Sequence, residues 1–267
     1  MESSAFIQAV TNGLAADQRV RGLYLGGSMG RGTADEWSDI DFIITAEPAD
    51  QAAIAHAWKD LLQSIAPIVF WNQMDGERMV LNAITEDWLR CDVAIQPPHT
   101  LLTRAQDRVR PLIDLDAVYP TLPATMPPKA PNPGYVRYVI HEFIRMLGLM
   151  PVGVGRGEFV TMALGLGMMR DHVAGLMMQS VTDPDPGGIL HQSKVLPPED
   201  MAVLRALPYP PLEREALIEA NLAIARQFMP RARALAKQLD IAWPDAFEAA
   251  TRRRLASTLG DAVAQGW

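Results

Sequence analysis

A proline-rich segment in the middle of the chain limits how the chain can fold. Six prolines stand between residues 120 and 133, at positions 120, 123, 127, 128, 131 and 133. Proline lacks a backbone N–H and has a fixed φ, so this density is incompatible with a helix interior or a central strand. We therefore predict a stiff linker or wrapped surface segment over residues 120–134, with one domain over 1–119 and a second over 135–267.

The residues before the prolines have the pattern of an α/β domain. Apolar residues at helical spacing predict helices over residues 4–14 and 51–65. Short runs rich in apolar, β-branched and aromatic residues predict strands, at 21–25, 39–45, 68–72, 78–84 and 90–95. We expect these elements to form a mixed sheet with helices packed against it.

The residues after the prolines have the pattern of a helical bundle. Apolar residues recur every three or four positions, which predicts helices over 135–149, 158–179, 213–239 and 244–259. We expect a loop over 183–198 and a bend or break in the third helix at Pro230. The predicted fold class is thus α/β followed by all-α.

Charge and cysteine content exclude several classes of protein. The 267 residues include 24 Lys and Arg against 31 Asp and Glu, a net charge of −7 that argues against a nucleic-acid partner. The single cysteine, Cys91, permits no intramolecular disulfide and no multi-cysteine zinc site. The sequence begins without a basic, apolar leader and has no apolar run long enough to span a bilayer, so we expect a cytoplasmic protein without a membrane partner.

The segment with the most specific chemistry covers residues 23–44, LYLGGSMGRGTADEWSDIDFII. A predicted strand runs into Gly26 and Gly27, and glycines let the backbone turn sharply and approach a ligand closely. Ser28 then offers a hydroxyl and a backbone N–H, and a helix beginning there would direct its N–H groups at an anion such as phosphate. Arg31 adds a forked cation suited to phosphate oxygens. The segment therefore predicts a phosphate-binding turn.

Two aspartates, Asp39 and Asp41, follow this turn at the start of a predicted strand. Residues i and i+2 of a strand share a face, so the two carboxylates would lie side by side and repel each other. A divalent cation relieves that repulsion, and Mg²⁺ favours such hard oxygen ligands. A P-loop is excluded because the segment has no lysine, and an EF-hand because Ile40 and Ala46 stand where it requires glycine and glutamate. A glycine turn followed by solvated aspartates is the alternative, and it leaves the combined spacing unexplained.

The combined pattern resembles the signature of the nucleotidyltransferase superfamily typified by DNA polymerase beta. The strings that carry the resemblance are GS at 27–28, RG at 31–32 and SDID at 38–41. They are most similar to those of the aminoglycoside and lincosamide nucleotidyltransferases. The resemblance implies a third carboxylate on a neighbouring strand, and Asp92, within an apolar run, is our candidate. Glu86 and Asp87, in the preceding turn, are the next candidates.

The resemblance also implies an activity, a cofactor and a co-substrate. We expect Mg²⁺-dependent transfer of a nucleoside monophosphate, AMP from ATP, to a hydroxyl of a small acceptor, with release of pyrophosphate. Asp39, Asp41 and Asp92 would form the metal site and the catalytic centre, with Asp92 also a candidate general base. Gly27, Ser28 and Arg31 would bind the nucleotide phosphates.

The acceptor is expected between the two domains, where small-ligand sites are common. Glu142 and Glu158 are the candidate substrate-binding residues, because carboxylates attract a cationic acceptor such as an aminoglycoside. For Glu158 the alternative is a purely structural role, since acidic residues are favoured in the first turn of a helix. The sequence leaves a homodimer open.

Three other functions fit the same fold. The first is an antitoxin or protein-AMPylating enzyme that acts on a protein partner, although such minimal proteins usually lack a large second domain. The second is an RNA nucleotidyltransferase that adds tRNA ends, which the acidic charge disfavours. The third is a non-catalytic nucleotide-binding module, which the presence of all three carboxylates disfavours.

Overall fold

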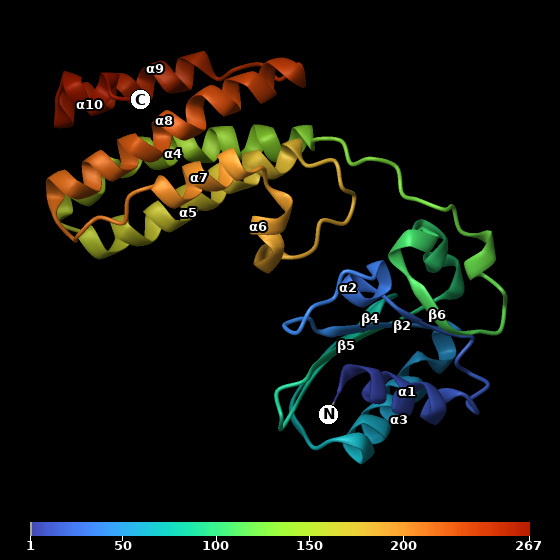
Figure 1. Ribbon diagram of the computed structural model, residues 1–267. Coiled ribbons are helices and arrows are strands. Elements are labelled where there is room, and N and C mark those ends of the chain that lie inside the picture. The colour runs from blue at the N-terminus through green and yellow to red at the C-terminus, as the bar shows by residue number, and fades with distance from the viewer. Residues whose placement is uncertain (1) are drawn as a thin grey trace. The chain divides into compact units, whose positions relative to one another are not determined.

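The computed structural model describes residues 2–267 and divides the chain into two compact units. One unit ends at Pro127 and the other begins at Pro128, so the division falls inside the proline-rich segment. The first unit contains a mixed sheet and the second is mostly helical (Figure 1). The predicted fold class is therefore confirmed, and the two units are described separately below.

The N-terminal unit contains a six-stranded sheet in the order β3-β4-β5-β2-β1-β6. Strands β2 and β5 are parallel, and the other neighbouring pairs are antiparallel. Its elements are α1 (Ser3–Leu14), β1 (Gly22–Leu25), α2 (Gly27–Arg31), β2 (Ile40–Thr45), α3 (Gln51–Ile65), β3 (Ile68–Met74), β4 (Met79–Thr85), β5 (Arg90–Gln96) and β6 (Arg110–Asp114).

Helices α1 and α3 cover one face of the sheet, and α2 lies on the other (Figure 1). Alternate residues of β2, including Ile40 and Phe42, point into the core beneath α1 and α3. There the Phe42 ring meets the edge of Trp58 at a centroid distance of 5.2 Å. Because side chains alternate along a strand, Asp41 points to the opposite face. Helices α1 and α3 thus leave the face beside α2 for polar side chains such as Asp41.

Strand β6 was not expected from the sequence. It contains Pro111, which cannot donate a ladder hydrogen bond and argues against a central strand. The structure places β6 at the edge of the sheet, beside β1, where a proline is tolerated. Position in the sheet, rather than local pattern, allows this strand to form.

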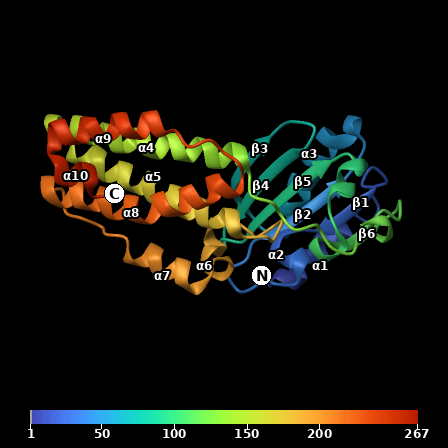
Figure 2. The ribbon, with the colours of Figure 1, turned by 90° about the horizontal axis from the view of Figure 1, so that it is seen from above.

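The C-terminal unit consists of helices. They are α4 (Pro133–Arg156), α5 (Phe159–Met177), α6 (Gln192–Val195), α7 (Pro198–Ala206), α8 (Arg214–Gln238), α9 (Asp245–Leu259) and α10 (Asp261–Gln265). Figure 2 shows α4, α5 and α8 running alongside one another. Between α4 and α8 the rings of Phe143 and Phe228 stack at 3.8 Å. No helix in residues 2–267 has the length and apolar character needed to cross a membrane.

Two prolines lie inside long helices of this unit. Helix α8 continues through Pro230, so it is not broken there, and the other expectation, a bend, stays a prediction. Helix α4 extends beyond its predicted end and includes Pro151. An interior proline loses one backbone hydrogen bond, and burial of the surrounding apolar residues, including Phe228 and Met229, offsets that loss.

A buried carboxylate joins the last helices of the C-terminal unit. Glu248 is 6% exposed and accepts hydrogen bonds from Trp243 Nε1 at 2.6 Å and from Arg252 Nε at 3.1 Å. It also forms an ion pair with Arg233. Burial acts to raise the pKa of Glu248, but the bonds from Trp243 and Arg252 and the two guanidinium charges outweigh it, so the pKa lies below its usual value.

We expect Glu248→Gln to lower the free energy of unfolding by about 2 kcal/mol at pH 7, because it weakens the charge-assisted hydrogen bonds that the buried carboxylate accepts. A carboxyl with a depressed folded-state pKa stabilises above its unfolded pKa and loses that contribution as the pH falls. The difference from the wild type should therefore shrink below about pH 4. Urea unfolding across this pH range measures it. Glu219→Gln, at an exposed pair with Arg226, is the control and should change stability by less than about 1 kcal/mol. Equal effects of the two substitutions would contradict the role of Glu248.

Candidate active site

Two of the predicted catalytic aspartates lie directly opposite each other. Strands β2 and β5 are adjacent and parallel, and their register pairs Asp41 with Asp92. On β5 the neighbours of Asp92, Cys91 and Val93, point into the core beneath α1 and α3. Asp92 therefore points to the opposite face, as Asp41 does. Residues that are 51 positions apart in the chain thus present neighbouring carboxyl groups on one face of the sheet.

The third predicted carboxylate, Asp39, stands just before β2. Like Asp41, it alternates with Ile40, so both side chains are expected on the same face of the sheet. The pKa of Asp92 is raised, chiefly by burial and also by the negative charge of Asp39. Arg90, whose Nη1 lies 3.6 Å from Asp39 Oδ2, opposes this shift. Asp39 and Asp92 are thus close enough to influence each other electrostatically. Asp39 also forms an ion pair with Arg90.

The predicted glycine turn packs against the Asp41 carboxylate. The N–H of Gly26 donates to the carbonyl oxygen of Asp41 at 2.9 Å, and α2 begins at Gly27. Gly27 has a φ of +51°, and a Cβ there would lie 1.8 Å from Asp41 Oδ2. A side chain would therefore displace the carboxylate, which explains the need for glycine at this position.

The predicted phosphate ligands lie on the short helix that follows the turn. Ser28 is 5% exposed, and within residues 2–267 its Oγ has no hydrogen-bond partner. Arg31 lies in the last turn of α2. A buried hydroxyl without a partner costs free energy unless a ligand satisfies it, so the turn is suited to accept an oxyanion. The predicted phosphate-binding role of Gly27, Ser28 and Arg31 is compatible with this geometry and stays a prediction.

A row of polar side chains extends the aspartate pair across the sheet, and sequence analysis missed it. The strand register pairs Asn72 with Asn82 and Asn82 with Asp92. The Nδ2 of Asn72 donates to Asn82 Oδ1 at 3.2 Å, and side-chain hydrogen bonding from Asn82 lowers the pKa of Asp92. Asparagine is uncommon within strands, and two of them on β3 and β4 were the available signal. Together they orient the Asp92 carboxyl group.

We expect Asn82→Ala to lower the catalytic rate of the protein about tenfold, because groups that orient a catalytic carboxylate typically contribute 10- to 100-fold. Asn72→Ala removes only the more distant hydrogen bond and should have a smaller effect. Steady-state kinetics of both variants make the comparison. Full activity of Asn82→Ala would show that Asp92 needs no such support.

The alternative carboxylates, Glu86 and Asp87, lie in the turn between β4 and β5 rather than on a strand. Asp87 accepts a hydrogen bond from Thr85 Oγ1, which lowers its pKa. In the strand register it is Asp92, five residues further along, that stands beside Asp41. The structure therefore favours Asp92 over these alternatives.

The two candidate acceptor ligands lie in the C-terminal unit and line different cavities. Glu142, on α4, is engaged by Arg145, whose Nε donates to Glu142 Oε2 at 2.8 Å. Glu158 stands just before α5, at the edge of a cavity that is mostly apolar. Their role in acceptor binding stays a prediction.

The donor set of the aspartates suits a hard divalent cation. Asp41 and Asp92 are neighbours on one face, and burial raises the pKa of Asp92, a penalty that a nearby cation would relieve. In the part of the chain that the structure describes, however, no three His, Cys, Asp or Glu side chains are gathered closely enough to form a complete metal site.

Comparison with known proteins gives a family match and 17 similar solved chains. No curated protein sequence matches the chain. An aminoglycoside 6-adenyltransferase from Bacillus subtilis is similar at 14% identity and a TM-score of 0.43, over 95% of this chain and 98% of that one. Terminal uridylyl transferase 4 from Trypanosoma brucei, with bound GTP, is similar at 17% identity and a TM-score of 0.30, over 84% of this chain and 64% of that one.

The family match covers the turn and the first two aspartates. The sequence model described as "Nucleotidyltransferase domain" matches residues 8–86, which include Gly27, Ser28, Asp39 and Asp41. The match lies wholly within the N-terminal unit and ends six residues before Asp92. Residues 8–86 of the N-terminal unit therefore carry a nucleotidyltransferase domain.

Proposed function

We propose that the protein transfers a nucleoside monophosphate, AMP from ATP, to a hydroxyl group of a small antibiotic-like acceptor of aminoglycoside or lincosamide type, and releases pyrophosphate. The observation that supports this most is the pairing of Asp41 with Asp92 beside a glycine turn that leaves no room for a side chain. It joins two acidic groups and the predicted phosphate-binding turn in one place, as phosphoryl chemistry requires.

Each of the predicted site residues would have a separate role in this reaction. Asp41 and Asp92 would hold Mg²⁺, and Asp39 would complete the set on leaving Arg90; the bound ion would neutralise the charge of the triphosphate. The backbone of Gly27 and the Ser28 hydroxyl would donate hydrogen bonds to phosphate oxygens. Arg31 would bind the pyrophosphate as it leaves.

Asp92 is also suited to accept a proton. The acceptor oxygen forms a bond to the α-phosphorus of ATP, the bond from that phosphorus to the β-phosphate oxygen breaks, and the acceptor proton passes to a base. Burial raises the pKa of Asp92, which makes this carboxylate a stronger base than an exposed one. Asn82 would keep it oriented during the transfer.

The acceptor would be recognised by the helical unit. Glu142 and Glu158 offer carboxylates to a cationic acceptor, and the net charge of −7 favours its approach. Because Glu142 is already paired with Arg145, an acceptor ammonium group would have to compete with that guanidinium. Glu158, which is exposed, has no such competitor among the described residues.

The test is to incubate the protein with ATP, Mg²⁺ and a panel of aminoglycosides and lincosamides, and to search for AMP adducts by mass spectrometry. The proposal predicts an adduct on at least one compound, with equimolar pyrophosphate, and neither product with Asp41→Asn. The same search on proteins of a cell extract tests the alternative. An adduct found on a protein and on no drug would favour the protein-AMPylating function and contradict the small acceptor.

A further inference from the structure

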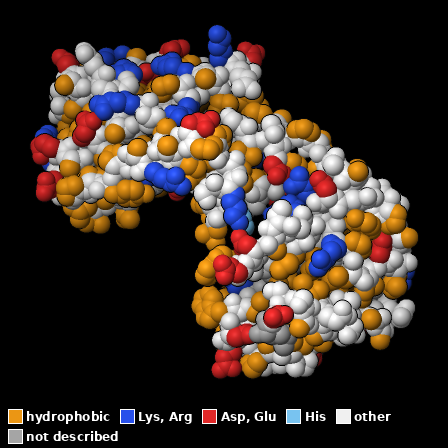
Figure 3. Space-filling view, viewed as in Figure 1, with side chains coloured by type: hydrophobic (Ala, Val, Ile, Leu, Met, Phe, Trp, Pro, Cys, Tyr) orange, Lys and Arg blue, Asp and Glu red, His pale blue; other side chains and the backbone are white. Residues whose placement is uncertain are grey.

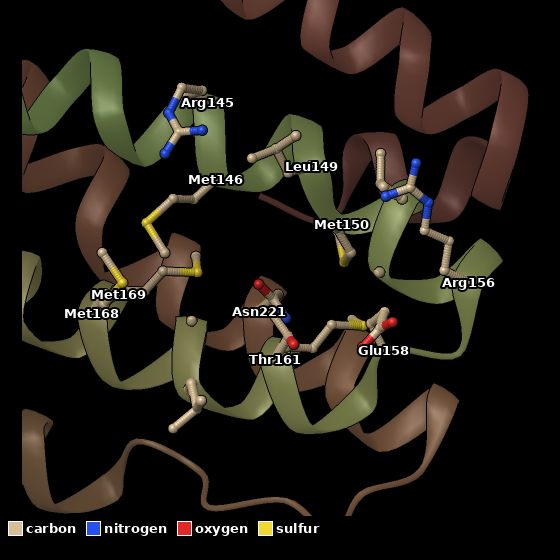
Figure 4. A pocket seen from close by; sticks show the side chains of 15 residues that line it. Arg145, Met146, Leu149, Met150, Arg156, Glu158, Thr161, Met168, Met169 and Asn221 are labelled. Atoms are coloured by element: carbon tan, nitrogen blue, oxygen red, sulfur yellow. The ribbon is translucent and has the colours of Figure 1, made fainter.

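A cavity lies between α4, α5 and α8 of the C-terminal unit. Its volume is ≈ 440 Å³, within the usual range for small-molecule sites. Its walls are mainly apolar, with five methionines among them: Met146, Met150, Met162, Met168 and Met169. Figure 4 shows these helices facing each other across the cavity. Methionine side chains are flexible and polarisable, so such walls adapt to a ligand's shape.

One polar group lies deep in this apolar cavity. Asn221, on α8, is 6% exposed and lines the cavity. Its Nδ2 donates to the carbonyl oxygen of Leu217 at 2.8 Å, which determines the orientation of the amide. No described residue donates a hydrogen bond to its Oδ1, and Figure 4 shows the amide directed into the cavity. An amide oxygen that faces a cavity can accept a hydrogen bond from a ligand with an N–H or O–H group.

The charged residues of the cavity do not suit a polycation inside it, and the acceptor contact proposed for Glu158 concerns only the edge of the cavity. Its lining includes Arg145 and Arg156 against the single carboxylate of Glu158. The apolar wall continues outward through Leu164 and Met168, which are 71% and 51% exposed. Figure 3 shows hydrophobic side chains gathered on the surface of this helical unit. The ligand should therefore have a largely apolar body.

We propose that this cavity binds a small, mainly apolar molecule whose buried end carries one hydrogen-bond donor, an N–H or O–H group that meets Asn221 Oδ1. This ligand differs in chemistry from a polycationic acceptor. The proposal concerns the helical unit alone and does not depend on the transfer reaction.

The first experiment uses 1-naphthol and 1-methoxynaphthalene as probes, which share an apolar body but differ in the hydroxyl donor. Both are titrated into the full-length protein carrying ¹³C-methyl methionine, with resonances assigned by Met→Leu variants. The proposal predicts saturable binding of one 1-naphthol per chain, with shifts at cavity methionines such as Met169 and none at Met74 on β3. The methoxy compound should bind about three- to tenfold more weakly.

Glycine variants on α5 test the position of the site. A Cβ at Gly165 would meet only Met146 Cε at 3.8 Å, and Gly165 lines the cavity, so Gly165→Leu should direct its side chain into the cavity. Gly167 has open space at its Cβ and does not line the cavity, so Gly167→Leu is the matched control. Gly165→Leu should weaken 1-naphthol binding at least tenfold and Gly167→Leu should not. Asn221→Ala should abolish the preference for 1-naphthol over the methoxy compound.

Three results would overturn the proposal. The first is the absence of saturable 1-naphthol binding, and the second is equal binding by the two leucine variants. The third is a dimer in sedimentation experiments that Gly165→Leu dissociates, which would make this face an interface between copies of the chain.

Discussion

Asp41→Asn and Asp92→Asn should each reduce the rate of pyrophosphate release about 1000-fold while leaving the protein folded. Each substitution keeps the shape of the side chain and removes one of two facing negative charges. Stabilising a triphosphate at a carboxylate-held cation contributes several kcal/mol, and each 1.4 kcal/mol of the barrier is about tenfold in rate. Initial rates with ATP and the acceptor identified in the panel measure the effect.

The stability of Asp92→Asn should change in the opposite direction from its activity. Burial raises the pKa of Asp92, so the charged form destabilises the folded state at neutral pH, and a neutral amide removes that penalty. In a magnesium-free buffer the melting temperature should equal or exceed that of the wild type. Asp60→Asn, at an exposed residue of α3, is the control and should affect neither quantity. A parallel loss of stability and activity would mean that Asp92 is structural.

Gly27→Ala should lower activity about 100-fold, because its Cβ would collide with the Asp41 carboxylate and move it. The substitution also forces a positive φ on alanine, which costs about 1–2 kcal/mol. Activity and urea unfolding of the variant separate the two effects.

Gly32→Ala is the matched control for this substitution. Gly32 ends α2 with a φ of +70°, but a Cβ there meets nothing within 4 Å. It should therefore show a similar loss of stability with nearly normal activity. If the two variants lose the same activity, backbone strain rather than the position of Asp41 is responsible.

Local pattern predicted most of the elements that carry the site. The strands of Asp41 and Asp92 were expected within two residues of their observed bounds, since both are short, apolar and bounded by polar residues. Strand β6 was missed because its proline is tolerated only at an edge, and the short helices α7 and α10 have little apolar periodicity of their own. Their formation depends on tertiary packing.

Register explains what the sequence could not show about the site. A strand's alternation indicates which residues share a face, but it does not indicate which residue of a neighbouring strand stands opposite. The pairs Asp41–Asp92, Asn82–Asp92 and Asn72–Asn82 join residues up to 51 positions apart through strand pairing alone. By contrast, the ion pair of Glu142 with Arg145 has the i, i+3 spacing of a helix and was predictable.

The most direct test of the central claim is to follow each phosphate of ATP. The protein is supplied in parallel with α-labelled and γ-labelled ATP, Mg²⁺ and the acceptor. If Asp41 and Asp92 form a nucleotidyl-transfer site, the α-label moves to the acceptor and the γ-label leaves as pyrophosphate. The double variant, with Asp41→Asn and Asp92→Asn in one chain, should show neither the transfer nor the release. Transfer of the γ-label to the acceptor, or α-label transfer that survives the double substitution, would contradict it.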